Sequence, residues 1–242
     1  MTLLSTETSA SIEQNLVSGV TTVACSASTG NIFAGRDDGN LSIYSDCLKE
    51  VSTISVHDDI ITAVSVNPFN CAECVSVSWD GQIGLIDCAS NNIEVINGHS
   101  GIINSISHNT KQPGVFGTTG KDSFLRLWDS RNINQGCTAL LPLQQIGSAC
   151  CWSSQSEYLI ACGMEDGCIH VADVRTNQLV TSSIDHCGRI SALVSPNNSC
   201  GSGGLSDSLL ISASVDKSMC TQTFDVLSEA LHNRFVNAHP SH

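Results

Sequence analysis

The sequence predicts an all-β fold made of five repeated units of four strands each. Three observations lead to this prediction. Short apolar runs, many of them alternating, recur along the chain, and turns rich in Gly and Asp separate them. The third run of each unit ends in an aspartate, at successive spacings of 41, 42, 44 and 52 residues. These aspartates are Asp46, Asp87, Asp129, Asp173 and Asp225. In the first four units, a turn aspartate also precedes the expected aromatic position by six residues: Asp38, Asp80, Asp122 and Asp166.

Each unit supplies four apolar runs of strand length, with turn residues between the second and the third. The predicted strands are 20–25, 31–36, 41–44 and 51–56; 60–66, 74–78, 83–86 and 93–96; 102–106, 115–119, 124–128 and 139–145; 149–152, 158–162, 168–172 and 179–184; and 190–194, 209–213, 219–224 and 232–236. An Asn-, Ser- and Gly-rich insertion at 197–207 is expected to be a mobile loop and explains the longest spacing.

The third unit has the most complete set of polar residues. His99 precedes its first strand, and Asp122 lies in the turn after its second. We expect Asp122 to accept from the imidazole, the imidazole to meet the Thr118 hydroxyl, and that hydroxyl to meet the indole N–H of Trp128. Such a network would lock the unit. A catalytic role for His99, Asp122 and Trp128 is the disfavoured alternative, because the repeat already accounts for them.

The Gly98-His99 and Trp128-Asp129 pairs, which open and close the hairpin region of one unit, resemble the WD-repeat family of β-propellers. Within that family the chain is most similar to the WD-repeat subunit of the methylosome, on the residues 56–66, 121–131, 179–183, 227–231 and 238–239. That family forms seven-bladed propellers, so five units imply an incomplete ring, an open arc with uncovered end blades. The resemblance divides the chain into a loose segment 1–17 with one possible strand at 12–17, a propeller at 18–239, and the start of a further blade at 240–242. The blades are expected at about 18–56, 57–98, 99–147, 148–185 and 186–238.

Composition excludes several classes of function. The 242 residues carry a net charge of −13, which favours a basic partner and argues against direct nucleic-acid binding. No run approaches the roughly 20 apolar residues of a membrane helix, and no secretory signal is seen. The thirteen cysteines are expected to be reduced thiols. Cys71 and Cys74 form a lone C-x-x-C pair without the second pair that a structural zinc needs, so we expect no metal and no cofactor.

The sequence contains no catalytic fingerprint, so we expect no enzymatic activity. The resemblance implies a cytoplasmic and nuclear adaptor that binds a protein arginine methyltransferase and presents basic Arg-rich tails, such as those of histones or spliceosomal Sm proteins. Asp58 and Asp59 are the candidate contacts for such tails, although they are equally well explained as solvated loop carboxylates. The alternative is a substrate receptor of a cullin-type ubiquitin ligase, for which the W-D-x-R pattern from Trp128 to Arg131 is the candidate contact.

Overall fold

A computed structural model describes residues 18–26, 28–47, 49–196, 209–224 and 234–236. The possible strand at 12–17, the insertion at 197–207, Asp225 and the end segment 240–242 lie outside the described residues. The fold class is confirmed: the described chain is all-β, with five antiparallel sheets of four strands each. It contains no helix with the length and apolar character needed to span a bilayer.

The strands follow the predicted order, with ends that shift by at most three residues. The first two sheets contain β1 (Val20–Cys25), β2 (Ile32–Arg36), β3 (Asn40–Tyr44), β4 (Glu50–Ser55), β5 (Ile61–Val66), β6 (Glu73–Ser78), β7 (Gln82–Asp87) and β8 (Asn92–Asn97). The next two contain β9 (Ile103–His108), β10 (Val115–Gly120), β11 (Phe124–Asp129), β12 (Ala139–Pro142), β13 (Gly147–Trp152), β14 (Leu159–Met164), β15 (Cys168–Asp173) and β16 (Gln178–Ile184). The fifth contains β17 (Ile190–Val194), β18 (Leu209–Ser214), β19 (Met219–Thr223) and β20 (Arg234–Val236).

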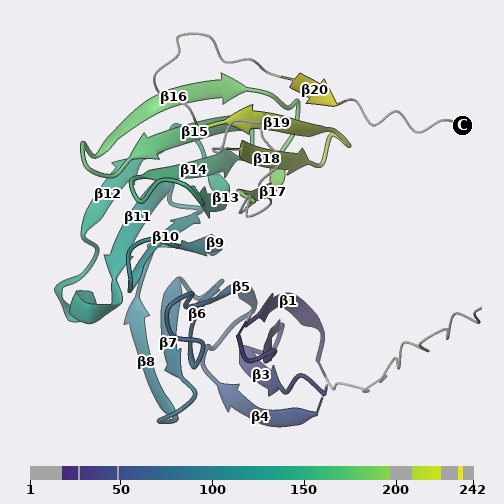
Figure 1. Cartoon of the computed structure of the whole chain (residues 1–242), viewed down its shortest axis with the longest axis vertical. Coiled ribbons are helices and arrows are strands. Elements are labelled where there is room, and N and C mark those ends of the chain that lie inside the picture. Colours follow the sequence, from purple (N-terminus) through teal and green to yellow (C-terminus); the bar gives the residue numbers. More distant parts are fainter. Residues whose placement is uncertain (1–17, 27, 48, 197–208, 225–233, 237–242) are drawn as a thin grey trace, which may run out of the picture.

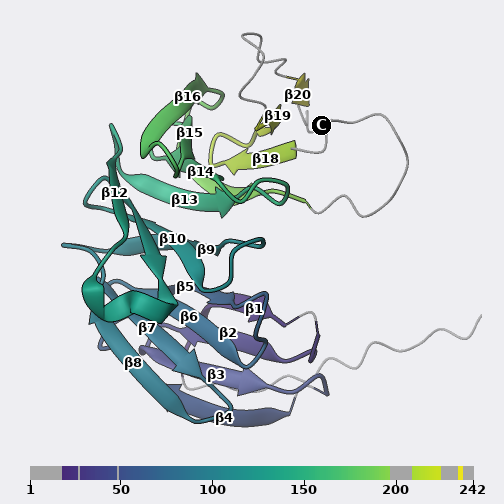
Figure 2. The ribbon, with the colours of Figure 1, turned by 60° about the vertical axis from the view of Figure 1, so that its left-hand side comes forward.

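Each sheet is a simple meander, so every blade is formed by one continuous stretch of chain. The first strand of each sheet is the innermost, and consecutive inner strands contact one another from β1 through β5, β9 and β13 to β17. Figures 1 and 2 show the five blades arranged along an arc, with the first and last blades at its two ends. The arrangement is that of an open propeller.

Four buried apolar clusters join the blades, and each lies between two consecutive sheets. The cluster between the second and third blades, for example, combines Val77 and Ile83 with Phe116 and Trp128. Because a two-faced blade cannot bury both faces alone, this packing between neighbours is the main source of stability in such folds.

A series of polar contacts also joins the inner strands. The second residue of each inner strand donates from its side chain to the backbone carbonyl of the first residue of the next inner strand. These contacts are Thr21 to Ile61 at 2.5 Å, Thr62 to Ile103 at 2.5 Å, Asn104 to Gly147 at 2.8 Å, and Ser148 to Ile190 at 2.7 Å. These polar side chains thus find acceptors across the blade interfaces, which sets the register of each blade against its neighbour.

One element was not predicted. A short 3-10 helix, η1 (Ser130–Gln135), follows β11, and the Asp129 side chain caps it by accepting from the Arg131 backbone N–H. The fourth strand of this blade also ends at Pro142, earlier than the predicted residue 145. Pro142 pairs with Phe124, the first residue of β11, so the ladder ends where its partner strand begins, and Leu143 N–H makes a last bond to the Ser123 carbonyl in the turn.

The close packing between blades generates a prediction. A Cβ added at Gly163 would lie 2.5 Å from Cγ2 of Ile190, the first residue of the next inner strand. We expect Gly163→Ala to lower the free energy of unfolding by about 1–3 kcal/mol, measured by chemical denaturation. At Gly101 the nearest atom to an added Cβ is 4.0 Å away, so Gly101→Ala is the matched control. Equal stability of the two variants would contradict the packing.

Candidate docking face

One face of the arc carries the loops that lead into the inner strands and the turns between the second and third strands, and we call it the turn face. In every blade a backbone hydrogen bond joins the loop to the turn, with the turn residue donating. These bonds are Asp37 to Gly19 at 3.0 Å, Trp79 to Ile60 at 3.0 Å, Lys121 to Ile102 at 2.8 Å, Glu165 to Ile146 at 3.1 Å, and Val215 to Arg189 at 3.0 Å. The turn face is therefore built on strand ends and not on free loops.

The third blade contains the hydrogen bonds that the sequence suggests. His99 Nδ1 lies 2.8 Å from Asp122 Oδ1, and His99 Nε2 lies 2.8 Å from the Thr118 hydroxyl. The indole Nε1 of Trp128 donates to the same hydroxyl at 2.8 Å. Since the Asp122 carboxylate can only accept, the imidazole proton is on Nδ1, and Nε2 of the neutral ring accepts from the Thr118 hydroxyl. The His99 side chain is fully buried, so it has no opening to a substrate.

The same network of a buried histidine, a turn residue and a strand hydroxyl, which we call the tie, recurs in two other blades. In the second blade His57 contacts Asp80 at 3.1 Å and the Ser76 hydroxyl at 2.8 Å. In the fifth, His186 contacts the hydroxyls of Ser218 at 2.6 Å and Ser212 at 2.8 Å. Sequence reasoning placed His57 and His186 at the start of units but gave them no role. The missed signal is their position, four residues before the buried isoleucine that begins each inner strand: Ile61, Ile103 and Ile190.

Burial keeps the imidazoles of His57 and His99 neutral. It lowers the pKa of each, and the neighbouring carboxylates, Asp80 and Asp122, only partly oppose this effect. Burial also raises the pKa of Asp122, but hydrogen bonds from His99 and Arg126, with the positive charge of Arg126, outweigh it, and the net pKa is lowered. At neutral pH the third blade thus holds a neutral imidazole against an ionised carboxylate.

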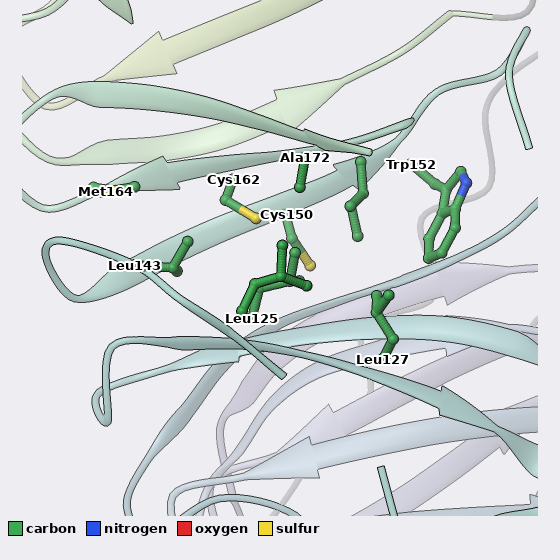
Figure 3. Close-up of a cluster of buried hydrophobic side chains, with 10 residues drawn as sticks. Leu125, Leu127, Leu143, Cys150, Trp152, Cys162, Met164 and Ala172 are labelled. Carbon is green, nitrogen blue, oxygen red and sulfur yellow. The ribbon is translucent and has the colours of Figure 1, made fainter. Parts of the chain in front are cut away.

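The fourth blade keeps its turn aspartate, Asp166, but replaces the buried members of the tie with apolar groups. Leu143 stands where the second, third and fifth blades have histidine, Cys162 where these blades have a hydroxyl, and Ala172 where the third blade has Trp128. All three are buried in one cluster, which Figure 3 shows. Burial raises the pKa of the Cys162 thiol well above its usual value, so it remains a neutral apolar group.

The first blade uses a guanidinium instead. Arg36 lies beside the turn carboxylate of Asp38 at 3.0 Å and donates to the Ser42 hydroxyl at 3.3 Å. An ionised donor thus satisfies the turn aspartate without a histidine.

The four candidate contact residues do not form one surface. Asp58 and Asp59 are exposed in the loop on the turn face, next to Ile60. Arg131 follows the end of β11 that is opposite the turn, so it lies on the face of the arc opposite the turn face. Trp128 is only 2% exposed, which corrects the expectation that it contacts a partner directly.

Two exposed arginines on this opposite face are held in the same way. Arg131 forms a two-point ion pair with Asp129, with distances of 2.8 and 2.7 Å, and Arg175 forms one with Asp173 at 3.1 and 2.7 Å. They lie in neighbouring blades, which makes this pair a second candidate docking position.

The two cysteines of the C-x-x-C pair in the second blade differ in burial. Cys74 is buried in β6, and Cys71 lies half-buried in the loop before it. Within the described ranges, no three His, Cys, Asp or Glu side chains gather in a way that could hold a metal ion.

The second and third blades match a family model. The model is that of the WD domain, G-beta repeat, and it matches residues 48–87 and 90–129. The chain therefore contains WD repeats. Its resemblance to this family, expected from the Gly-His and Trp-Asp pairs, is confirmed, and the ties of the second and third blades are built on residues of these WD repeats.

Two known proteins extend the comparison. The methylosome protein WDR77 of Xenopus laevis is 24% identical to this WD-repeat chain over 182 residues, which cover 72% of the chain and 54% of WDR77. The chain thus spans about half the length of that relative. A chain in a crystal structure of the mitotic checkpoint complex is similar with a TM-score of 0.78 and 18% identity, covering 94% of this chain and 67% of that one. This second likeness shows the fold alone.

Truncation of the buried indole tests the tie in the third blade. Trp128→Ala removes a ring that stacks on Phe116 and leaves the Thr118 hydroxyl without its donor. We expect the free energy of unfolding to fall by about 3–5 kcal/mol. Trp79 is 46% exposed, so the control Trp79→Ala is expected to cost about 1 kcal/mol or less in the same denaturation experiment. Similar losses for both variants would show that Trp128 has no special structural role.

Proposed function

We propose that this WD-repeat protein is a non-catalytic adaptor of the cytoplasm and nucleus that binds a protein arginine methyltransferase and presents basic Arg-rich tails to it. Histone and spliceosomal Sm-protein tails are the substrate class. Two findings support the proposal: the WD repeats themselves, which commonly serve as scaffolds for proteins, and the similarity to a methylosome protein.

The observation that carries the substrate part is the exposed acidic loop on the turn face. Asp58 and Asp59 are exposed, and neither is in an ion pair within the described part of the chain. The Asp59 carboxylate accepts from the Ile60 backbone N–H at 2.8 Å, which holds it in place. The whole chain carries a net charge of −13, which adds to the attraction of cations. The loop therefore offers an anionic docking point for guanidinium groups.

Charge reversal in this loop tests the substrate part. Asp58→Lys combined with Asp59→Lys should weaken binding of a labelled Arg-rich histone-tail peptide by about fivefold or more, and added salt should weaken the wild type likewise. The matched control is Asp46→Lys with Glu50→Lys, which changes the net charge equally at exposed carboxylates away from the turn face. If the control weakens binding as much, the loop is not the docking point.

The partner part is tested by co-purification with a recombinant arginine methyltransferase. A second candidate partner is the adaptor of a cullin-type ubiquitin ligase, favoured by the exposed and fixed Arg131 and Arg175 in neighbouring blades. Arg131→Ala with Arg175→Ala should abolish capture of that ligase adaptor and leave capture of the methyltransferase unchanged. If the wild-type protein captures the ligase adaptor but not the methyltransferase, and the double variant loses that capture, the ligase proposal replaces the methyltransferase proposal.

A further inference from the structure

A cavity of about 160 Å³ lies between the second and third blades, toward the face opposite the turn face. The second blade contributes the start of β6, the end of β7 and the first half of β8, and the third blade contributes His108 and Ser130. Three of the lining residues are carboxylates: Glu73, Asp87 and Glu94. No lysine or arginine is among the described residues that line it. The cavity is therefore an anionic recess between two blades.

The three carboxylates come from neighbouring strands of the second sheet. Glu73 is directly opposite Asp87 in the ladder between β6 and β7, and Glu94 is opposite Leu85, two residues before Asp87. Like charges directly opposite each other destabilise a sheet. Within the described residues, none of the three is in an ion pair. A bound cation would relieve a repulsion that the fold itself leaves in place.

Glu94 is the carboxylate with the most capacity left for a ligand. Glu73 accepts from the Asn67 side-chain amide at 2.8 Å, and Asp87 accepts from the Ser90 hydroxyl at 2.6 Å. Glu94 is half-buried, and no side chain or backbone group of the described chain forms a hydrogen bond or ion pair with its carboxylate. Because a half-buried charge without a partner is costly, Glu94 marks the point at which a cation would bind.

A buried imidazole also lines the cavity. His108 is only 8% exposed, and its Nδ1 lies 2.7 Å from the Ser65 hydroxyl. Its Nε2 has no hydrogen-bond partner among the residues that the structure describes. Burial lowers the pKa of His108 to about 4, so the ring is neutral at pH 7. With the Nδ1 proton donated to Ser65, Nε2 is left as an acceptor for a ligand in the cavity.

The chemistry of the lining selects the kind of cation. In the described ranges, no three His, Cys, Asp or Glu side chains gather closely enough to hold a metal ion, which favours a larger, organic cation. A guanidinium has about five N–H donors in one plane and no acceptor, so it matches a wall of carboxylates and an imidazole acceptor. The cavity has the volume of roughly five water molecules at about 30 Å³ each, which is enough for one carbon and three nitrogens.

An exposed aromatic ring beside the cavity indicates that the ligand is part of a protein. Phe69 is 49% exposed in the loop between β5 and β6. Its backbone N–H donates at 2.9 Å to the side chain of Asn67, which lines the cavity. Exposed aromatic side chains are typical anchors of protein interfaces.

We propose that this cavity binds the guanidinium group of an arginine side chain that a partner protein presents to the face opposite the turn face. The Glu94 carboxylate pairs with the guanidinium, Glu73 adds a second negative charge, and His108 Nε2 accepts one N–H. The site shares no residue with the Asp58–Asp59 loop and lies on the other face, so it does not depend on the function proposed above.

The probe is an N-acetylated peptide amide of sequence Gly-Arg-Gly, titrated into the full chain at low salt and followed by isothermal titration calorimetry. We expect Glu94→Gln, which keeps the size of the side chain and removes its charge, to weaken binding about fivefold or more. Glu50→Gln makes the same change at an exposed carboxylate on the outer strand of the first blade, and this matched control should leave affinity unchanged. Thermal melts should show that Glu94→Gln is at least as stable as the wild type, because the substitution also removes repulsion.

A neutral copy of the ligand makes the outcome decisive. Citrulline has the shape of arginine with an uncharged urea group, and its peptide should bind about tenfold more weakly. Equal binding of the two peptides would overturn the proposal, and so would equal affinities of Glu94→Gln and Glu50→Gln.

The variants of the acidic loop separate the two sites. Asp58→Lys with Asp59→Lys should weaken binding of the single-arginine peptide no more than the charge-matched control Asp46→Lys with Glu50→Lys. If the loop variant weakens it further and Glu94→Gln does not, the arginine binds at the loop, and the cavity proposal fails while the loop proposal stands. If Glu94→Gln alone weakens it, the cavity proposal stands whatever the loop binds.

Discussion

The structure depends on one buried interaction: an imidazole that must find a partner for each of its two nitrogens. His57, His99 and His186 sit under the turn face with side chains that are fully buried. One nitrogen contacts a turn residue and the other a hydroxyl on the second strand, so each histidine joins the leading loop, the turn and the sheet of its blade. A buried polar group costs little when every bond is made, and a great deal when one is missing.

In the two remaining blades the histidine and the groups that it would contact are replaced together, while the turn aspartate is kept. The fourth blade has no polar member at any of the three positions, since Leu143, Cys162 and Ala172 are all apolar and buried. The first blade keeps its turn carboxylate and satisfies it with Arg36. Neither blade keeps a histidine without partners. In all five, the leading loop and the turn are still joined by the same backbone hydrogen bond, and this holds the turn face and its acidic loop in place.

Strand order, turn positions and the tie of the third blade follow from the sequence, because alternation and the spacing of aspartates report directly on strands and turns. What lies between blades does not follow from such a pattern. The donors Thr21, Thr62, Asn104 and Ser148 bond to carbonyls about forty residues away, and a polar residue in a strand does not reveal which neighbour it faces. The sequence led us to assign Trp128 both to a buried hydrogen-bond network and to a partner contact. These roles are incompatible, but the W-D-x-R pattern does not reveal which of its residues are buried. The structure leaves only Arg131 of that pattern exposed.

A double-mutant cycle in the second blade tests the central claim most directly, because no indole depends on the Ser76 hydroxyl there. His57→Leu and Ser76→Cys together copy the Leu143 and Cys162 pair of the fourth blade. Each single substitution leaves one buried partner unsatisfied and should lower the free energy of unfolding by about 1–3 kcal/mol. The double variant should lose at least about 1 kcal/mol less than the sum of the two. Additive losses would contradict the account, since they would mean that the histidine and the hydroxyl contribute independently and not as one tie.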